Sequence, residues 1–132
     1  MKILFLCVAN SARSQIAEGL AKKIFGTNAY IESAGSEPSG KVHPMAITVM
    51  KDAGIDISKH TSKAIGQLNP TFVNELDYVV TLCAEEVCPI INSQAKKLHW
   101  PLHDPAAPSS NQKEAFEKTR DIVQEKIKAL LV

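Results

Sequence analysis

The strongest constraint on the fold is a change of hydrophobic period within the first 26 residues. After Lys2, residues 3–8 are apolar without interruption, which is typical of a strand buried on both faces of a parallel sheet. From Ser14 the apolar residues recur at helical spacing until Gly26, which predicts a helix that ends at that glycine. A buried strand followed at once by a helix is the first half of a βαβ unit, so the pattern favours an α/β fold.

The same alternation continues along the chain. Further strands are expected at 29–34, 77–83 and 97–102, and further helices at 44–53 and 111–131. We therefore predict one α/β domain over residues 1–132, with a four-stranded parallel sheet, helices on both faces and right-handed crossovers. In such sheets ligands bind beyond the carboxyl ends of the strands. Cys7 and Cys83 each stand at such an end, so two thiols are expected on one edge of the sheet.

Composition narrows the classes of function. The chain has 132 residues and a formal net charge of +1, which argues against a broad basic surface for nucleic acid. No apolar run approaches the ~20 residues of a membrane span or the core of a signal peptide. Three cysteines are too few, and odd in number, for a secreted disulfide framework. We expect a cytoplasmic monomer without nucleic-acid or membrane partners, whose cysteines serve catalysis, redox chemistry or metal binding, with buried structural thiols as the alternative.

The segment CVANSAR, between the first strand and the first helix, predicts an anion site. The residues between Cys7 and Arg13 are small or compact, so their backbone N–H groups can turn toward one centre beside a helix N-terminus. Arg13 adds a two-pronged donor, and the same field would hold Cys7 as a thiolate. A buried cysteine and a surface arginine are the alternative. The predicted oxyanion loop consists of Val8, Ala9, Asn10, Ser11, Ala12, Arg13 and Ser14, the last donating a hydrogen bond to the thiolate.

Cys-X5-Arg-Ser at the first strand-to-helix turn resembles the low-molecular-weight protein tyrosine phosphatases and their relatives, the thioredoxin-coupled arsenate reductases. The resemblance extends over most of the chain, through FLCVANSARSQIAEG, ESAG, DISKHTSK, VVTLC and LHWPLHDPA. It implies the low-molecular-weight tyrosine phosphatase fold. In both families a carboxylic acid before a late proline protonates the leaving group, which makes Asp104 the implied general acid. A turn-forming Asp-Pro pair without a catalytic role is the alternative.

The remaining cysteines favour the reductase over the phosphatase. A phosphatase needs Cys7, Arg13 and Asp104 but no further thiol, whereas arsenate must receive two electrons. The resemblance implies that Cys7 attacks arsenate and that Cys83 then forms a disulfide with Cys7 and releases arsenite. Cys88 next moves the disulfide to Cys83–Cys88, which thioredoxin reduces. This redox-active disulfide is the only cofactor-like group expected, and a mycothiol- or glutaredoxin-coupled variant is the alternative for the reductant.

Two further observations bear on this choice. Ala106, Ala107 and Pro108 follow the Asp-Pro pair, and the loop EPSGKV has no aromatic residue, so a phenyl ring would find little to stack on. A small inorganic anion needs no such walls, and we expect phosphate to occupy the loop and inhibit. A regular helix would separate the Cα atoms of Cys83 and Cys88 by about 8.7 Å, beyond the ~7 Å limit for a disulfide. We therefore expect residues 84–89 to rearrange between redox states.

Two positions depart from the family pattern. Ala9 stands where both families usually have glycine, which costs about 1 kcal/mol if that position requires a positive φ. Lys63 stands where several of these reductases have an aspartate. The resemblance implies that in those reductases this aspartate binds potassium, together with residues that match Asn10, Glu18 and Ser33. A lysine cannot ligate a cation. We predict that the Lys63 ammonium takes the cation's place, hydrogen-bonding Glu18 or Ser33 and supporting Asn10.

A zinc site is the alternative from another class. Cys83, Cys88, His99 and His103 are spaced CX4C, ten residues, HX3H, superficially similar to a Cys2His2 site. In such a site the two histidines stand on one helix, whereas Pro101 separates them here in a strand-like segment. A zinc-dependent binding module is therefore the remote alternative.

Overall fold

One parallel sheet forms the centre of the structure, a computed structural model that describes residues 1–84, 89–108 and 111–130. Its strands are β1 (Lys2–Cys7), β2 (Tyr30–Gly35), β3 (Tyr78–Cys83) and β4 (Lys96–Leu102). They lie in the order β2-β1-β3-β4, and every neighbouring pair is parallel. The helices are α1 (Arg13–Phe25), α2 (Pro44–Asp52), α3 (Pro70–Asn74) and α4 (Gln112–Leu130), with short 3-10 turns at Gly26–Asn28 and Ile65–Gln67.

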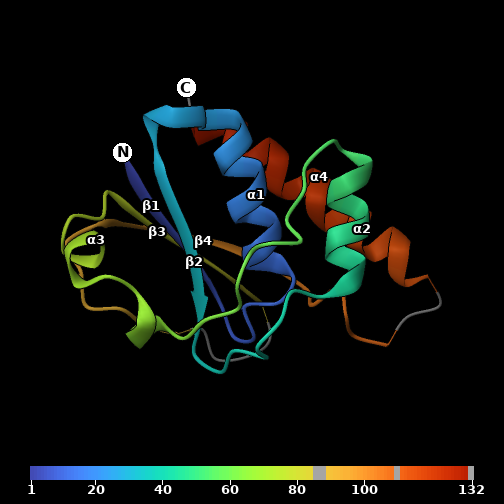
Figure 1. Cartoon of the computed structure of the whole chain (residues 1–132), viewed down its shortest axis with the longest axis horizontal. Coiled ribbons are helices and arrows are strands. Elements are labelled where there is room, and N and C mark those ends of the chain that lie inside the picture. Colours follow the sequence, from blue (N-terminus) through green and yellow to red (C-terminus); the bar gives the residue numbers. More distant parts are fainter. Residues whose placement is uncertain (85–88, 109–110, 131–132) are drawn as a thin grey trace.

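Both faces of the sheet are covered (Figure 1). Helices α1, α2 and α4 lie on one side, and the short α3 lies on the other. Ile3 and Phe5 of β1 belong to the larger core, on the side of α1, α2 and α4, whereas Leu4 and Leu6 belong to the smaller core with Phe72 of α3. Because successive side chains of a strand point to opposite faces, this double burial explains the uninterrupted apolar run in β1. The predicted four-stranded parallel sheet with helices on both faces is confirmed.

The helix ends follow local sequence signals. Gly26 has φ 62 and ends α1, as predicted, and Gly54 has φ 79 just past α2. Asn111 caps α4, because its Oδ1 accepts a hydrogen bond from the Glu114 N–H at 3.0 Å. Helix α3 is not predicted by the sequence pattern, because its five residues are too few to show a helical period.

The carboxyl ends of the strands share one edge of the sheet. Cys7 at the end of β1 pairs with Gly35 at the end of β2, and Cys83 at the end of β3 pairs with Leu102 at the end of β4. The loops that follow these four residues therefore gather beside one another. Among the described residues no helix combines the length and the apolar character needed to cross a membrane.

Candidate active site

The peptide groups of the oxyanion loop have their carbonyl oxygens directed outward. Each carbonyl of residues 8–12 accepts a hydrogen bond from outside the loop. The donors are the backbone N–H groups of Glu37, Ser39, His43 and Ile16 and the side chain of Gln15, at 2.8 to 3.2 Å. Because the N–H of a trans peptide points away from its carbonyl, the N–H groups of residues 9–13 turn toward the centre of the loop. Converging N–H groups at the start of α1 make a nest for a tetrahedral anion.

The end of β2 approaches this loop so closely that only glycine fits there. A Cβ added to Gly35 would lie 2.3 Å from the carbonyl oxygen of Val8 and 3.0 Å from the backbone N of Asn10. Ser62 fastens a second segment, since its Oγ donates to the Ala9 carbonyl and accepts from the Gly40 N–H, both at 3.2 Å. The loop is therefore held by backbone contacts on several sides, which preorganises it before an anion binds.

Cys7 is buried at the base of the loop, and its sulfur faces a hydroxyl. Cys7 Sγ lies 2.8 Å from Ser14 Oγ, and Asn10 Nδ2 donates to the same Oγ at 2.7 Å. Since Ser14 accepts from Asn10, the hydroxyl hydrogen of Ser14 remains available to the sulfur. A hydrogen bond donated to the sulfur favours its charged form, which is the form that acts as a nucleophile.

Asn10 holds the turn of the loop. Among the described residues it is the one non-glycine residue with a positive φ, 47°, and asparagine tolerates this left-handed conformation better than most residues. The conditional cost of alanine at position 9 therefore does not arise, because Ala9 lacks a positive φ. The Asn10 side chain is fully engaged: Nδ2 also donates to Ser33 Oγ at 3.0 Å, and Oδ1 accepts from the Lys63 backbone N–H at 2.9 Å.

A buried carboxylate continues this network, and its cation is not the predicted one. Ser33 Oγ donates to Glu18 Oε1 at 2.5 Å, and Lys22 Nζ lies 2.6 Å from Glu18 Oε2. The predicted contact of the Lys63 ammonium with Glu18 or Ser33 is wrong, because Lys63 Nζ faces Glu32 at 4.0 Å. Lys22 stands one helical turn after Glu18 on the same face of α1, so it reaches the carboxylate first. Lys63 supports Asn10 through its backbone instead.

Two residues without an assigned role complete the network behind the loop. Gln15 is fully buried, and its Oε1 lies 3.1 Å from His60 Nδ1, which is 3.6 Å from Glu18 Oε2. Burial lowers the pKa of His60, Glu18 opposes this shift, and Lys22 adds to it. The i,i+4 spacing of Glu18 and Lys22 was a usable signal in the sequence. Nothing in the sequence pattern distinguished Gln15.

Arg13 connects the loop to the carboxyl end of β4. Its side chain is buried, and Nη1 donates to the carbonyl oxygen of Leu102 at 2.9 Å. Asp104, the implied general acid, follows two residues later on the same edge. It is exposed, and its Oδ1 accepts the Ala106 N–H at 2.9 Å, which closes the turn. The structure thus brings Asp104 to the edge that carries Cys7, and its role as an acid stays a prediction.

Comparisons with known proteins agree with this architecture. The family model described as low molecular weight phosphotyrosine protein phosphatase matches residues 2–132. The chain belongs to this family. It is 44% identical over 128 residues to arsenate reductase 2 of Staphylococcus saprophyticus, covering 96% of this chain and 92% of that relative.

Two solved structures of arsenate reductases resemble this family member. One, an arsenate reductase in the phosphate binding state, is 36% identical with a TM-score of 0.83, covering 98% of this chain and 95% of that chain. The other, a thioredoxin-dependent arsenate reductase of Corynebacterium glutamicum, is 28% identical with a TM-score of 0.73, covering 98% of this chain and 61% of that chain.

Cys7 and Cys83 of this family member lie on neighbouring strands. Cys7 ends β1 as a free thiol, and Cys83, which is buried and disulfide-bonded, ends the adjacent β3. Adjacent strands are about 4.8 Å apart, so the two residues occupy one end of the sheet. Cys88 lies outside the described residues, as does most of the segment 84–89 that we predict to rearrange. The pairing of Cys83 with Cys88 stays a prediction.

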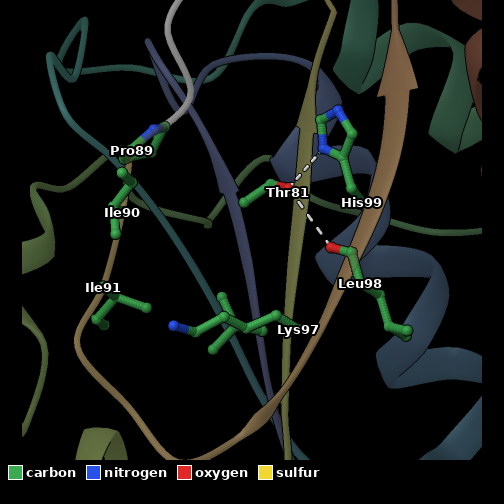
Figure 2. Close-up of a pocket in the computed structure, with 8 residues that line it drawn as sticks. Thr81, Pro89, Ile90, Ile91, Lys97, Leu98 and His99 are labelled. Carbon is green, nitrogen blue, oxygen red and sulfur yellow. Dashed lines mark hydrogen bonds between the residues drawn. The ribbon is translucent and has the colours of Figure 1, made fainter.

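A small cavity opens beside β3 and β4. Figure 2 shows it between β3, β4 and the chain after Pro89, where Thr81 Oγ1 lies 2.7 Å from His99 Nδ1. Ile90 and Ile91 border it on one side, and Ile90 is 90% exposed. His99 is thus engaged by a hydroxyl. Within the described part of the chain no three His, Cys, Asp or Glu side chains are grouped to hold a metal ion.

Proposed function

We propose that this chain reduces arsenate to arsenite, using a relay of its three cysteines that thioredoxin regenerates. The observation that carries the proposal is that two cysteines lie close together at one edge of the sheet. Cys7 is a free thiol in the predicted anion-binding loop, and Cys83 ends the next strand. Hydrolysis of a phosphate ester needs the loop and an acid such as Asp104 but no second thiol, whereas two-electron reduction needs a second thiol within reach. The arsenate reductases among the similar proteins support the same choice.

The first step is substitution at arsenic. The loop N–H groups and Arg13 bind the arsenate oxygens, and the Cys7 thiolate attacks the arsenic atom. A sulfur–arsenic bond forms and an arsenic–oxygen bond breaks. Asp104 donates a proton to the departing oxygen, which leaves as water. Arsenic remains in the +5 state in this adduct, since no electrons have yet been transferred.

The next two steps move the electrons. The Cys83 thiolate attacks Cys7 Sγ, a disulfide forms, and the electron pair of the sulfur–arsenic bond stays with arsenic, which leaves as arsenite in the +3 state. Cys88 then attacks Cys83, which releases Cys7 as a thiolate and forms the Cys83–Cys88 disulfide. A free Cys7 beside an oxidised Cys83 fits the stage after that release.

A dithiol protein must supply the two electrons that reduce the final disulfide. Thioredoxin is the proposed reductant, a role supported by the thioredoxin-dependent neighbour from Corynebacterium glutamicum. Because thioredoxin is kept reduced in the cytoplasm, that compartment is the proposed location. The enzyme then needs no tightly bound cofactor beyond its own cysteines, and it works as a monomer.

The test is a coupled assay with thioredoxin, thioredoxin reductase and NADPH. Arsenate should trigger NADPH consumption by the wild type, and each single replacement Cys7→Ser, Cys83→Ser and Cys88→Ser should abolish it. Hydrolysis of p-nitrophenyl phosphate, measured in parallel, should be lost in Cys7→Ser alone. If Cys83→Ser and Cys88→Ser consume NADPH as the wild type does, the relay is wrong. If arsenate has no effect on the wild type while the ester is hydrolysed rapidly, the chain is a phosphatase.

A further inference from the structure

Gln15 has an unusual set of hydrogen bonds for a residue without an assigned role. It stands in the first turn of α1 and is fully buried. Its Nε2 lies 3.2 Å from the backbone oxygen of Asn10, 3.1 Å from Asn10 Oδ1 and 3.0 Å from the carbonyl oxygen of Thr61. Its Oε1 faces His60 Nδ1 at 3.1 Å. Three oxygen acceptors on one side and an imidazole N–H on the other fix the orientation of the amide.

The two contacts with Asn10 act on different parts of that residue. The backbone oxygen of Asn10 belongs to the peptide that leaves the left-handed turn, whereas Oδ1 sets the orientation of the side chain. A left-handed φ in a non-glycine residue persists only when its surroundings hold it. Gln15 therefore secures both the backbone turn and the direction in which Asn10 Nδ2 points.

Asn10 Nδ2 in turn reaches the nucleophile through one hydroxyl. Nδ2 donates to Ser14 Oγ at 2.7 Å, which leaves the Ser14 hydrogen to Cys7 Sγ at 2.8 Å. If Asn10 rotated its amide, it would present an oxygen to Ser14, and the hydroxyl hydrogen would turn away from the sulfur. The orientation of the Gln15 amide thus influences the hydrogen bond that Cys7 receives, and it does so through Asn10 and Ser14.

We propose that Gln15 is a positioning residue of the oxyanion loop, which holds Asn10 in its left-handed conformation and thereby directs the Ser14 hydrogen bond to Cys7. The His60 Nδ1–H holds the other end of the Gln15 amide by donating to Oε1. The Lys63 backbone N–H also binds Asn10 Oδ1, at 2.9 Å, so loss of Gln15 weakens the arrangement without abolishing it. This role concerns the loop itself and holds for either chemistry that the loop performs.

The test replaces Gln15 by methionine, which has similar length and no hydrogen-bond donor. Binding of inorganic phosphate is measured by isothermal titration calorimetry, and alkylation of Cys7 by iodoacetamide is followed against pH with mass-spectrometric assignment of the site. We expect Gln15→Met to weaken phosphate binding about tenfold, as the loss of one to two buried hydrogen bonds implies. We also expect the midpoint of Cys7 alkylation to move to higher pH, because the thiolate loses its donor.

Val49→Ala is the matched control. Val49 is fully buried in α2 and belongs to the larger core, so its truncation lowers stability without touching Asn10. A merely structural role for Gln15 predicts that both variants leave the alkylation midpoint in place, and that outcome would overturn the proposal. If Gln15→Met does not fold, Gln15→Asn replaces it, because the shorter side chain keeps the amide but withdraws it from Asn10. Neither readout uses arsenate, so failure here and failure of the reductase assay are separate results.

Discussion

Among the glycines of the chain, Gly35 is the one whose replacement by alanine should disrupt the oxyanion loop most. The added Cβ would lie 2.3 Å from the Val8 carbonyl oxygen and 3.0 Å from the Cys7 carbonyl oxygen. Both are backbone atoms of neighbouring segments, and Gly35 is itself fixed by its N–H bond to the Lys63 carbonyl at 3.0 Å. Neither side can yield by rotating a side chain. Relief therefore requires the end of β2 or the loop to shift by roughly 1 Å, since carbon–oxygen contacts settle near 3.3 Å or more.

Overpacking of this kind costs about 1–3 kcal/mol when side chains can adjust, so a clash between backbone segments should reach at least ~3 kcal/mol. For a chain of this size that corresponds to a melting temperature lower by roughly 10 °C. The affinity for phosphate should also fall, because the Val8 carbonyl belongs to the first peptide of the loop and a shift of that carbonyl reorients the Ala9 N–H. Circular dichroism melting and calorimetry measure the two effects. Gly66→Ala is the control, as a Cβ there meets nothing within 4 Å. A Gly35→Ala protein that melts and binds phosphate like the wild type would refute the reasoning.

Three shorter predictions concern the network behind the loop. Ser14→Ala should slow iodoacetamide alkylation of Cys7 near neutral pH by about tenfold, because one hydrogen bond to the thiolate is lost; an unchanged rate would contradict the orientation inferred for that hydroxyl. Lys22→Met should lower the free energy of unfolding, measured in urea, by about 1–3 kcal/mol, since Glu18 stays buried without its cation, whereas exposed Lys23→Met should not. The pKa of His60 is lowered in the folded state, so as the pH falls the unfolded chain protonates this histidine before the folded chain does. The free energy of unfolding should therefore decrease as the pH drops below the ordinary value of 6.5. The urea midpoint of His60→Gln should depend less steeply on pH in that range than the wild-type midpoint does. An identical pH dependence in the two proteins would contradict the role of His60.

The sequence predicted most of the fold because its local signals agree. The uninterrupted apolar run of β1, the helical period after Ser14 and Gly26 at the helix end each specify one element, and together they specify the βα unit. The small residues between Cys7 and Arg13 likewise predicted that the loop curves so that its N–H groups turn toward one centre. The short α3 gave no such signal, since its start at Asn69 and Pro70 marks a turn as readily as a helix.

The residues that make up the network behind the loop were easier to predict than the contacts between their side chains. Asn10, Glu18 and Ser33 lie together as the resemblance implied, but the cation beside them comes from Lys22. Lys63 stands where relatives have an aspartate, which suggested that its ammonium would lie beside Glu18. The long side chain is directed to the carboxylate of Glu32 instead. Matching a position transfers the place of a backbone atom reliably. It does not transfer the direction of a flexible side chain.

The geometry of the loop also sets the direction of the proposed relay. In a thiol–disulfide exchange the sulfur that leaves most readily is the one best stabilised as a thiolate. In the proposed Cys7–Cys83 disulfide that sulfur would be Cys7, because the Ser14 hydroxyl lies 2.8 Å from it and the loop carbonyls are directed outward, which turns the loop N–H groups inward. In the proposed relay, attack by Cys88 on Cys83 would therefore release Cys7 as a thiolate that the Ser14 hydroxyl stabilises. The contacts that make Cys7 a nucleophile in the first step make it the leaving group in the third, and weakening them, as in Ser14→Ala, should slow both.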